Sequence, residues 1–443
     1  ASAVLTEIFP KLKSKTFSFA KLRGSIARVG NDAGFDRLIN SYSYGGLFRN
    51  DMAWFQGDAV RKNPNLKPET TISKEIGAEV RLLDGRLTAD VTYYDKYTRD
   101  QIVESELSYL SNYQRVIINS GKISNKGWEI SVSGVPVKVK NFEWKTIFNW
   151  SKNNSMVESL PEGIDKIQIG SGVYNVKSYA EVGKPYGAIY AKTFKRDAEG
   201  YILCQLDGSP KEGQDYEYLG CVQADWRGGW NNVFRLGNFS FSVMFDFQKG
   251  GKFFSQTSIQ SSVDGQSVKS LEGRDADFFS RKILGESDEE RYGFMRPQNA
   301  NTPTANGQIY PDWGRPKGVV LPNCRYDEDV EGLAGQQVLG YCTPERYWMH
   351  YTSRDISRFI YDASYVKLRE ITVSYDLPKK WLRKTPFQTF RVAAVGRNIA
   401  TLFANTPHGL DPQATSTTGN AQGFERGFNL PSATYGFDIK VSF

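Results

Sequence analysis

The last ten residues, TYGFDIKVSF at 434–443, alternate without interruption between polar and apolar side chains. Because successive side chains of a β-strand point to opposite faces, a period of two predicts a strand with one apolar and one polar face. An amphipathic helix would repeat its apolar residues about every 3.6 positions instead. The apolar positions are Tyr435, Phe437, Ile439, Val441 and Phe443.

The same alternation recurs along the chain and predicts ten strands. In FSFSVMFDF at 239–247, for example, every second position is phenylalanine or valine. Most of the predicted strands exceed the ~5–6 residues typical of soluble sheets and reach the ~9–11 that a tilted strand needs to cross a bilayer. They are 17–29, 70–83, 86–99, 122–136, 142–153, 226–236, 238–249, 360–377, 387–402 and 431–443.

Short and long connections alternate between these strands. Asp84-Gly85 is a strong signal for a tight hairpin turn, and Gly237-Asn238 links two further alternating runs. If the short turns lie at one end of the sheet, every long connection lies at the other. This pattern predicts an all-β, antiparallel transmembrane β-barrel with long extracellular loops, whereas a soluble propeller or sandwich does not readily explain the one-sided loops. The long connections are 31–68, 101–121, 154–225, 250–358 and 404–430.

The composition excludes several other classes of protein. No stretch approaches the ~18–20 unbroken apolar residues of a membrane-spanning helix, and 40% hydrophobic residues argue against intrinsic disorder. The net charge of +7 is mild and the basic residues are scattered, so no nucleic-acid partner is expected. Because the chain has only two histidines, His350 and His408, both in loop-like surroundings, we expect no catalytic residue, no metal site and no cofactor. The run Asp327-Glu328-Asp329 lacks the glycine and the spacing of an EF-hand loop and is interpreted as a solvated acidic loop.

The four cysteines fall into two local pairs. Cys204 and Cys221 enclose 16 residues, and Cys324 and Cys342 enclose 17. An even count in two similar Gly- and Asp-containing intervals, without metal-ligand spacing, predicts two disulfides and an oxidising compartment. Four unrelated thiols are the alternative, and the spacing does not establish which cysteines pair.

Several phrases resemble those of the SusC/RagA branch of the TonB-dependent receptors. NPNLKPE at 63–69, followed by KEIGAE at 74–79, is similar to a phrase of TonB-dependent receptors, and DASYVKLREITVSYDLP at 362–378 is similar to one of the SusC/RagA branch. Each phrase is weak alone, but together they follow the family order from about residue 17 to the end. The shorter ones are LRGS at 22–25, VGND at 29–32, ADW at 224–226, GGWNN at 228–232, GRN at 396–398 and GLDP at 409–412.

The resemblance implies a large outer-membrane barrel of the Bacteroidetes type, with about 22 strands and a plugged lumen. It identifies residues 1–443 as the C-terminal part of such a barrel, with the plug domain and the early strands absent from this chain. Residues 154–225 and 250–358 would be its long extracellular loops. The alternative is a self-contained ten-stranded barrel, because even strand numbers from about 8 upward occur.

The resemblance also implies a role in nutrient import. Receptors of this branch take up oligosaccharides or oligopeptides together with a SusD-like surface lipoprotein lid, and TonB acts through the plug-bearing part. Loop aromatics would pack the loops together, contact the lid or contact substrate, and the first two uses are the more common. The candidates are Tyr310, Trp313, Tyr347 and Trp348.

The final strand also indicates how the protein would be inserted into the membrane. An alternating strand that closes on an aromatic residue resembles the C-terminal signal by which outer-membrane barrels are recognised for insertion, and here that signal would be Tyr435, Phe437 and Phe443. We therefore expect an integral outer-membrane protein that contacts lipid and the remaining barrel segment. A stand-alone barrel with an adhesive or structural role, or with hydrolytic activity, is the alternative function.

Overall fold

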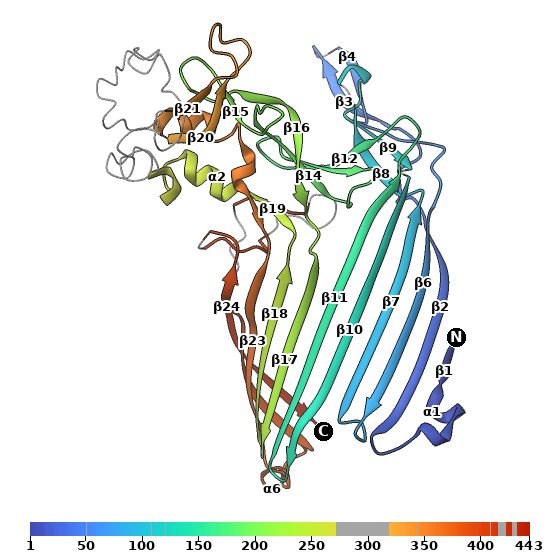
Figure 1. Ribbon diagram of the computed structural model, residues 1–443. Coiled ribbons are helices and arrows are strands. Elements are labelled where there is room, and N and C mark those ends of the chain that lie inside the picture. Colours follow the sequence, from blue (N-terminus) through green and yellow to red (C-terminus); the bar gives the residue numbers. More distant parts are fainter. Residues whose placement is uncertain are drawn as a thin grey trace, which may run out of the picture.

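The largest unit of the molecule is an antiparallel sheet of eleven strands (Figure 1). The computed structural model describes residues 1–443 except 50, 108, 120, 272–318, 343, 408, 415–421 and 428–431. Each strand pairs with its neighbour in the sheet over most of its length. In order across the sheet the strands are β1 (Ser2–Val4), β2 (Phe17–Asn31), β6 (Glu69–Leu82), β7 (Leu87–Arg99), β10 (Lys122–Val139), β11 (Phe142–Ser159), β17 (Trp226–Leu236), β18 (Phe239–Lys249), β23 (Tyr365–Asp376), β24 (Thr389–Ala404) and β26 (Thr434–Ser442).

The ten strands predicted from alternation are all present in this sheet, which confirms the all-β fold. Two details differ from the prediction. Strand β1 was not predicted, because three residues are too few to show a period of two. The predicted strand 360–377 is divided, since β22 (Ile360–Asp362) leaves the large sheet and pairs with β19 (Lys252–Ser255) instead.

Short turns and long connections lie at opposite ends of the sheet, as predicted (Figure 1). The turn between β6 and β7 places Leu83, Asp84 and Gly85 at positive φ, which Asp and Gly tolerate and which lets the chain reverse within a few residues. Residues 140–141 and 237–238 make the next two turns, and the last contains the short helix α6 (Lys379–Leu382).

The long connections fold into small sheets rather than irregular loops, which period-two analysis of long strands did not predict. We call the structured parts of 160–222 and 252–360 the loop domain. Its core holds buried apolar residues from both connections. The small sheets are β12 (Lys166–Ser171), β13 (Lys177–Glu181), β14 (Ala188–Phe194) and β16 (Glu212–Cys221); β15 (Ile202–Cys204), β20 (Val319–Tyr326) and β21 (Gln337–Cys342); β22, β19 and β25 (Phe424–Glu425); β3 (Tyr42–Phe48) and β4 (Met52–Gly57); and β5 (Val60–Arg61), β9 (Arg115–Asn119) and β8 (Ile102–Glu106).

Helices are few and short in the described part of the chain. None of them is both long and apolar enough to cross a membrane. They are α1 (Leu5–Ile8), α2 (Gln256–Val263), α5 (Pro344–Arg346) and α6, with single helical turns η1 (Pro10–Leu12), η2 (Tyr109–Ser111), η3 (Val268–Leu271), η4 (Tyr347–Tyr351) and η5 (Ile356–Phe359).

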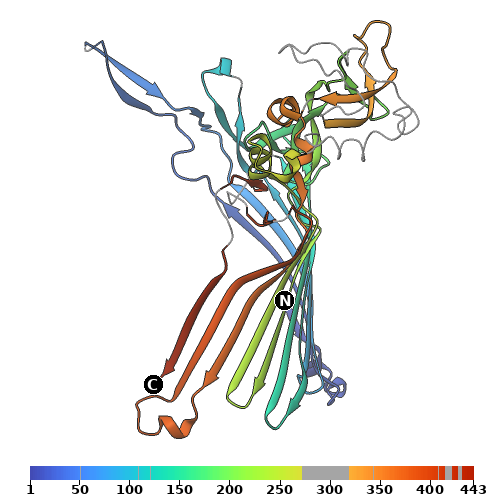
Figure 2. The same ribbon diagram turned by 90° about the vertical axis from the view of Figure 1, so that its left-hand side faces the viewer.

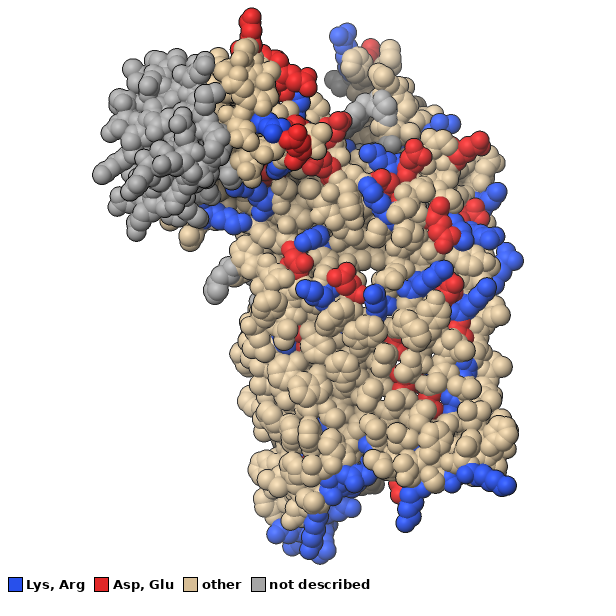
Figure 3. Space-filling model, viewed as in Figure 1, with Lys and Arg blue, Asp and Glu red and all other residues tan. Residues whose placement is uncertain are grey.

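One face of the large sheet exposes its apolar side chains. Ile76, in the middle of β6, is 63% exposed, and Phe437 on β26 is 85% exposed. A broad zone with few charged residues covers the strands, with mixed charges above it and Lys and Arg below it (Figure 3). Water-soluble proteins rarely expose an apolar surface of this size, whereas the lipid-facing side of a barrel requires one.

The sheet is curved but open (Figure 2). In the described chain β1 pairs with β2 and β26 pairs with β24, and each has its other edge unpaired. These strands therefore do not close into the self-contained ten-stranded barrel that the sequence left open. An unpaired edge cannot face lipid, because lipid offers no hydrogen-bond partner for its peptide groups.

A charge on the apolar face should destabilise the barrel. We predict that Val80→Arg, on the same face as Ile76, lowers the free energy of unfolding of the full-length receptor in lipid by about 2–4 kcal/mol, because the guanidinium would lie among the apolar side chains between Lys74 and the turn at Asp84. Urea titration followed by heat-modified gel mobility measures this loss. The matched control is Ser25→Arg, on the polar face opposite Glu75, which should cost less than about 1 kcal/mol. Equal losses in the two variants would show that the face of Ile76 does not contact lipid.

Candidate functional site

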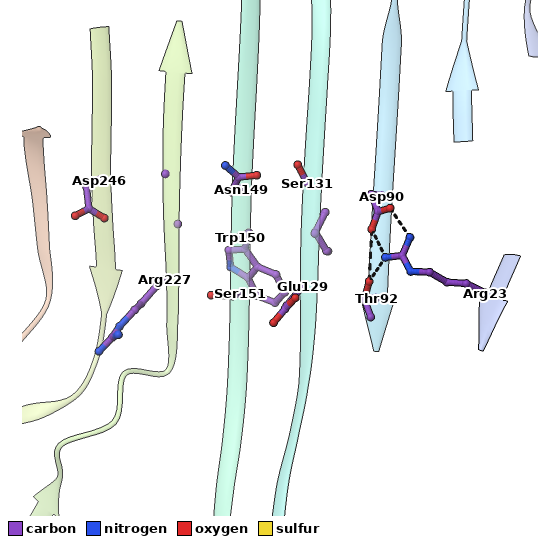
Figure 4. Close-up of a pocket in the computed structure, with 13 residues that line it drawn as sticks. Arg23, Asp90, Thr92, Glu129, Ser131, Asn149, Trp150, Ser151, Arg227 and Asp246 are labelled. Atoms are coloured by element: carbon purple, nitrogen blue, oxygen red, sulfur yellow. Dashed lines mark hydrogen bonds and ion pairs between the residues drawn. The ribbon is translucent and has the colours of Figure 1, made fainter. Parts of the chain in front are cut away.

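The polar face of the sheet would line the lumen of a closed barrel. Its side chains surround a shallow hollow of ≈ 450 Å³, which residues of six strands line (Figure 4). Positive and negative groups both line it. The polar residues are Arg23, Asp90, Thr92, Glu129, Ser131, Asn149, Ser151, Arg227 and Asp246. None was singled out from the sequence, although they occupy the polar positions of the predicted strands.

Arg23 on β2 reaches across β6 to Asp90 on β7 (Figure 4). Its Nη1 and Nη2 donate to the two carboxylate oxygens at 2.6 Å each, and Nη2 also donates to Thr92 Oγ1 at 2.5 Å. Gly77 makes this path possible, because a Cβ at residue 77 would lie 2.7 Å from Arg23 Nε. Gly77 belongs to the KEIGAE phrase. Its missing side chain leaves room for Arg23 to reach Asp90 and form a bidentate ion pair on the lumen wall.

The same arrangement recurs on the next strands. Tyr94 on β7 crosses β10 and donates from its hydroxyl to Asn153 Oδ1 on β11 at 3.0 Å. Gly127 lies beneath the ring, where a Cβ would be 2.4 Å from Tyr94 Oη and 2.3 Å from the carbonyl oxygen of Lys152. Asn153 in turn donates to Asn125 Oδ1 at 3.1 Å. The wall is therefore held together by side chains that each span two strand spacings.

A second polar cluster lies where the lumen wall meets the long connections. The Lys367 side chain is only 1% exposed, and its Nζ donates to the carboxylate of Asp411 and to Gln413 Oε1. Arg369 donates from Nε to Asp246 Oδ2 at 3.2 Å and from Nη2 to Gln413 Oε1 at 2.6 Å. An ammonium this deeply buried requires a paired carboxylate, so these contacts fasten the 404–414 connection over β23.

A hydroxyl-rich hollow of ≈ 470 Å³ lies beside helix α2, next to Pro407, Leu410 and Gly427. Glu425, which is buried, accepts hydrogen bonds from Ser255 Oγ at 2.7 Å and from Thr257 Oγ1 at 2.6 Å. The hollow is also lined by Lys269, so that hydroxyl and ammonium groups face it beside apolar side chains such as Val268 and Leu410. Such a surface can hydrogen-bond a polar ligand that reaches the lumen mouth.

The loop aromatics predicted to contact substrate or lid have different positions. Tyr347 and Trp348 are 1% and 2% exposed, and their ring centroids are 5.1 Å apart in an edge-to-face arrangement. They pack the core of the loop domain and offer no surface to a ligand. Tyr310 and Trp313 lie outside the described residues, as does His408, while His350 is exposed on η4.

The structure places Cys204 and Cys221 in different small sheets, and the two disulfides stay a prediction. Strand β15 pairs in parallel with β20, which brings Cys204 close to Cys324 rather than to Cys221. A hydrogen bond with Cys324, together with burial, raises the pKa of Cys204. Cys342 lies in the same core, whereas Cys221 lies in the sheet of β14 and β16. Local spacing could not indicate this contact, because the loop domain joins segments 120 residues apart in the sequence.

The acidic run 327–329 is only partly solvated, contrary to its interpretation as a solvated loop. The Asp327 side chain is 3% exposed and lies 2.9 Å from Lys195 Nζ and 2.8 Å from Lys211 Nζ, whereas Asp329 is 69% exposed. Burial opposes ionisation, but the hydrogen bonds from the two lysines outweigh it and lower the pKa of Asp327 to about 2. In the described part of the chain no group of three or more His, Cys, Asp or Glu residues is placed to hold a metal ion.

The aromatics of the expected insertion signal lie on or beside β26. Tyr435 and Phe437 belong to its exposed apolar face. Phe443 follows the strand, and its ring centroid is 5.3 Å from that of Phe387 in an edge-to-face contact. Their role in insertion stays a prediction.

Filling the space under Tyr94 should weaken the lumen wall. We predict that Gly127→Ala lowers the free energy of unfolding by about 1–3 kcal/mol, because the new methyl group would overlap both the Tyr94 ring and a backbone carbonyl. Gly24→Ala is the control, since its Cβ would meet no atom closer than 3.8 Å. Denaturant midpoints of the two variants measure the difference, and equal midpoints would contradict the close approach at Gly127.

The Asp327 ion pairs should make the loop domain sensitive to acid. A carboxylate whose pKa falls from 3.8 to about 2 on folding stabilises the fold above pH ~4 and loses that contribution as the pH falls toward ~2. We predict that Asp327→Asn costs on the order of 2 kcal/mol at neutral pH and that this cost shrinks below pH ~4. Limited proteolysis of the loop domain against pH measures it, with exposed Asp329→Asn as the control. A cost that does not change with pH would contradict the assignment.

Comparisons with known proteins agree with this architecture. The model of the TonB dependent receptor-like β-barrel family matches residues 14–166. TonB-dependent receptor P3 of Formosa agariphila is 25% identical over 395 residues, which cover 84% of this chain and 33% of the relative. TonB-dependent receptor SusC of Bacteroides thetaiotaomicron is 29% identical over 104 residues, which cover 23% of this chain and 10% of the relative.

The fold also has a solved counterpart. The structure of the RagAB peptide transporter superposes with a TM-score of 0.66 at 16% identity, over 100% of this chain and 43% of that chain. The matches cover only 26–33% of the length of the first curated relatives. The alternating strands and the exposed apolar face agree with these matches: residues 14–166 resemble the TonB dependent receptor-like β-barrel family, the curated relatives are TonB-dependent receptors, and the fold resembles that of a RagAB chain.

Proposed function

We propose that the chain forms part of the wall and of the extracellular rim of a SusC-like importer for oligopeptides or oligosaccharides. The observation that carries the proposal is the polar face of the sheet, where a hollow of ≈ 450 Å³ presents guanidinium, carboxylate, amide and hydroxyl groups. A face of this chemistry needs water or a polar solute against it, and a transport lumen supplies both.

The remaining barrel would complete the wall. We propose that residues 1–443 are the C-terminal part of a longer receptor and that β1 and β26 pair with strands outside this chain. The plug and the contact with TonB would then belong to that other part. An unpaired strand edge in lipid would leave peptide N–H and C=O groups without hydrogen-bond partners, and its high free-energy cost supports the proposal.

A SusD-like lipoprotein is the proposed lid over the loop domain. The hairpin of β3 and β4 supports this, because it projects from the end of the sheet that carries the long connections (Figure 2). Its exposed apolar side chains are typical of a protein–protein contact. They are Tyr42, Tyr44, Leu47, Phe48, Met52, Trp54 and Phe55.

Of the two substrate classes, oligopeptides fit the described wall better. A peptide carries both charge signs and many amide groups, which match the mixed charges around Arg227 and Asp246. The RagAB counterpart is described as a peptide transporter, although its likeness extends to the fold alone. Transport rather than hydrolysis is proposed, since the relatives are named as receptors.

The test is uptake by the full-length receptor together with its native partners. Molecules that co-purify with the complex are identified by mass spectrometry, and labelled oligopeptides and oligosaccharides are then offered to cells. We expect Arg227→Gln to lower peptide uptake by about tenfold, as expected for the loss of one charged hydrogen bond. Lys140→Gln, at the turn end of the sheet, should leave uptake unchanged. Peptide uptake at the wild-type rate in the Arg227 variant, or selective uptake of oligosaccharides, would overturn the peptide assignment.

A further inference from the structure

The turn end of the sheet carries an excess of exposed basic side chains. We call this set the basic rim. Figure 3 shows it as a border of Lys and Arg beneath the apolar zone. Several acidic side chains at this edge are already paired, Glu7 with Lys13, Glu143 with Lys138 and Asp376 with Arg391. The rim residues are Lys11, Lys13, Lys15, Arg86, Lys138, Lys140, Arg235, Lys379, Lys380, Arg383 and Lys384.

The segment KKWLRK at 379–384 concentrates four of these cations. Leu382 is buried and holds the short helix α6 in place, while Trp381 is 60% exposed. The two lysines before Trp381 and the two cations after Leu382 are all exposed. Among the described residues none of these four cations forms a salt bridge, so their charges face solvent.

Apolar side chains border the rim on its membrane side. A tryptophan with flanking lysines and arginines is typical of the interface between hydrocarbon and headgroups. Because the apolar zone lies directly above the basic rim, the rim lies at the depth of the lipid headgroups. The exposed apolar residues at this end of the sheet include Leu83, Val137, Leu236, Phe239 and Phe443.

We propose that the basic rim binds the headgroups of anionic phospholipids in the periplasmic leaflet of the outer membrane. Short turns lie on the periplasmic side of outer-membrane barrels, so the rim meets that leaflet. Each ammonium or guanidinium can donate to a phosphodiester oxygen while its stem follows the apolar surface. The opposite end of the sheet carries both acidic and basic side chains, so it does not attract anionic headgroups in the same way (Figure 3). The inference depends on the outer-membrane location and not on the proposed import.

The experiment compares lipid binding by variants of the full-length receptor. The receptor is reconstituted in mixed vesicles of phosphatidylethanolamine and phosphatidylglycerol, extracted with mild detergent, and its retained lipids are measured by mass spectrometry. We expect several-fold enrichment of phosphatidylglycerol over the bulk composition. The variant K379Q/K380Q/R383Q/K384Q should lose most of this enrichment, and heat-modified gel mobility verifies that its barrel is folded.

A matched variant removes four exposed cations from the opposite end, R49Q/R61Q/K67Q/R196Q, and should keep the enrichment. Enrichment that survives in the rim variant, or that both variants lose equally, would overturn the proposal. Inorganic phosphate at millimolar concentration should not displace the lipid. Displacement would assign the rim to free anions instead. Preferential binding of an acidic protein over phosphatidylglycerol vesicles would likewise contradict it.

Discussion

The structure depends on one constraint, that peptide groups in lipid must find hydrogen-bond partners within the protein. Long antiparallel strands meet this constraint in the interior of the sheet, because their N–H and C=O groups bond to the strands on both sides. The alternation of TYGFDIKVSF follows from it, since a strand between lipid and an aqueous lumen needs one apolar and one polar face. The same constraint explains the short turns at one end and the folded connections at the other, which lie beyond the hydrocarbon.

The polar face adds a second layer of organisation to the backbone ladder. Arg23 and Tyr94 each cross a glycine to reach a partner two strands away. Their hydrogen bonds tie alternate strands together on the lumen side, where water alone would not order the side chains. Lys367 and Arg369 do the same for the connection above β23. Four of the family-like phrases therefore have a physical role: KEIGAE supplies a clearance at Gly77, and LRGS, DASYVKLREITVSYDLP and GLDP supply charged side chains of the wall.

The sequence predicted the large sheet well, because a period of two repeated over long strands is a strong local signal. It did not predict the loop domain, whose strands are short and whose pairings join distant segments. For that reason the sequence did not show that Cys204 lies near Cys324, and Asp327 was interpreted as solvated although it is buried between Lys195 and Lys211. Burial of Tyr347 and Trp348 likewise arises from tertiary packing that no local pattern contains.

The central claim is that this open sheet is one section of a larger closed barrel. Hydrogen–deuterium exchange of the full-length receptor in lipid nanodiscs tests it most directly, at the backbone amides of the edge strands β1 and β26. If other strands pair with these edges, their amides should exchange as slowly as those of β10 and β11 in the middle of the sheet. Fast exchange at β26, with slow exchange in the interior strands, would contradict the account.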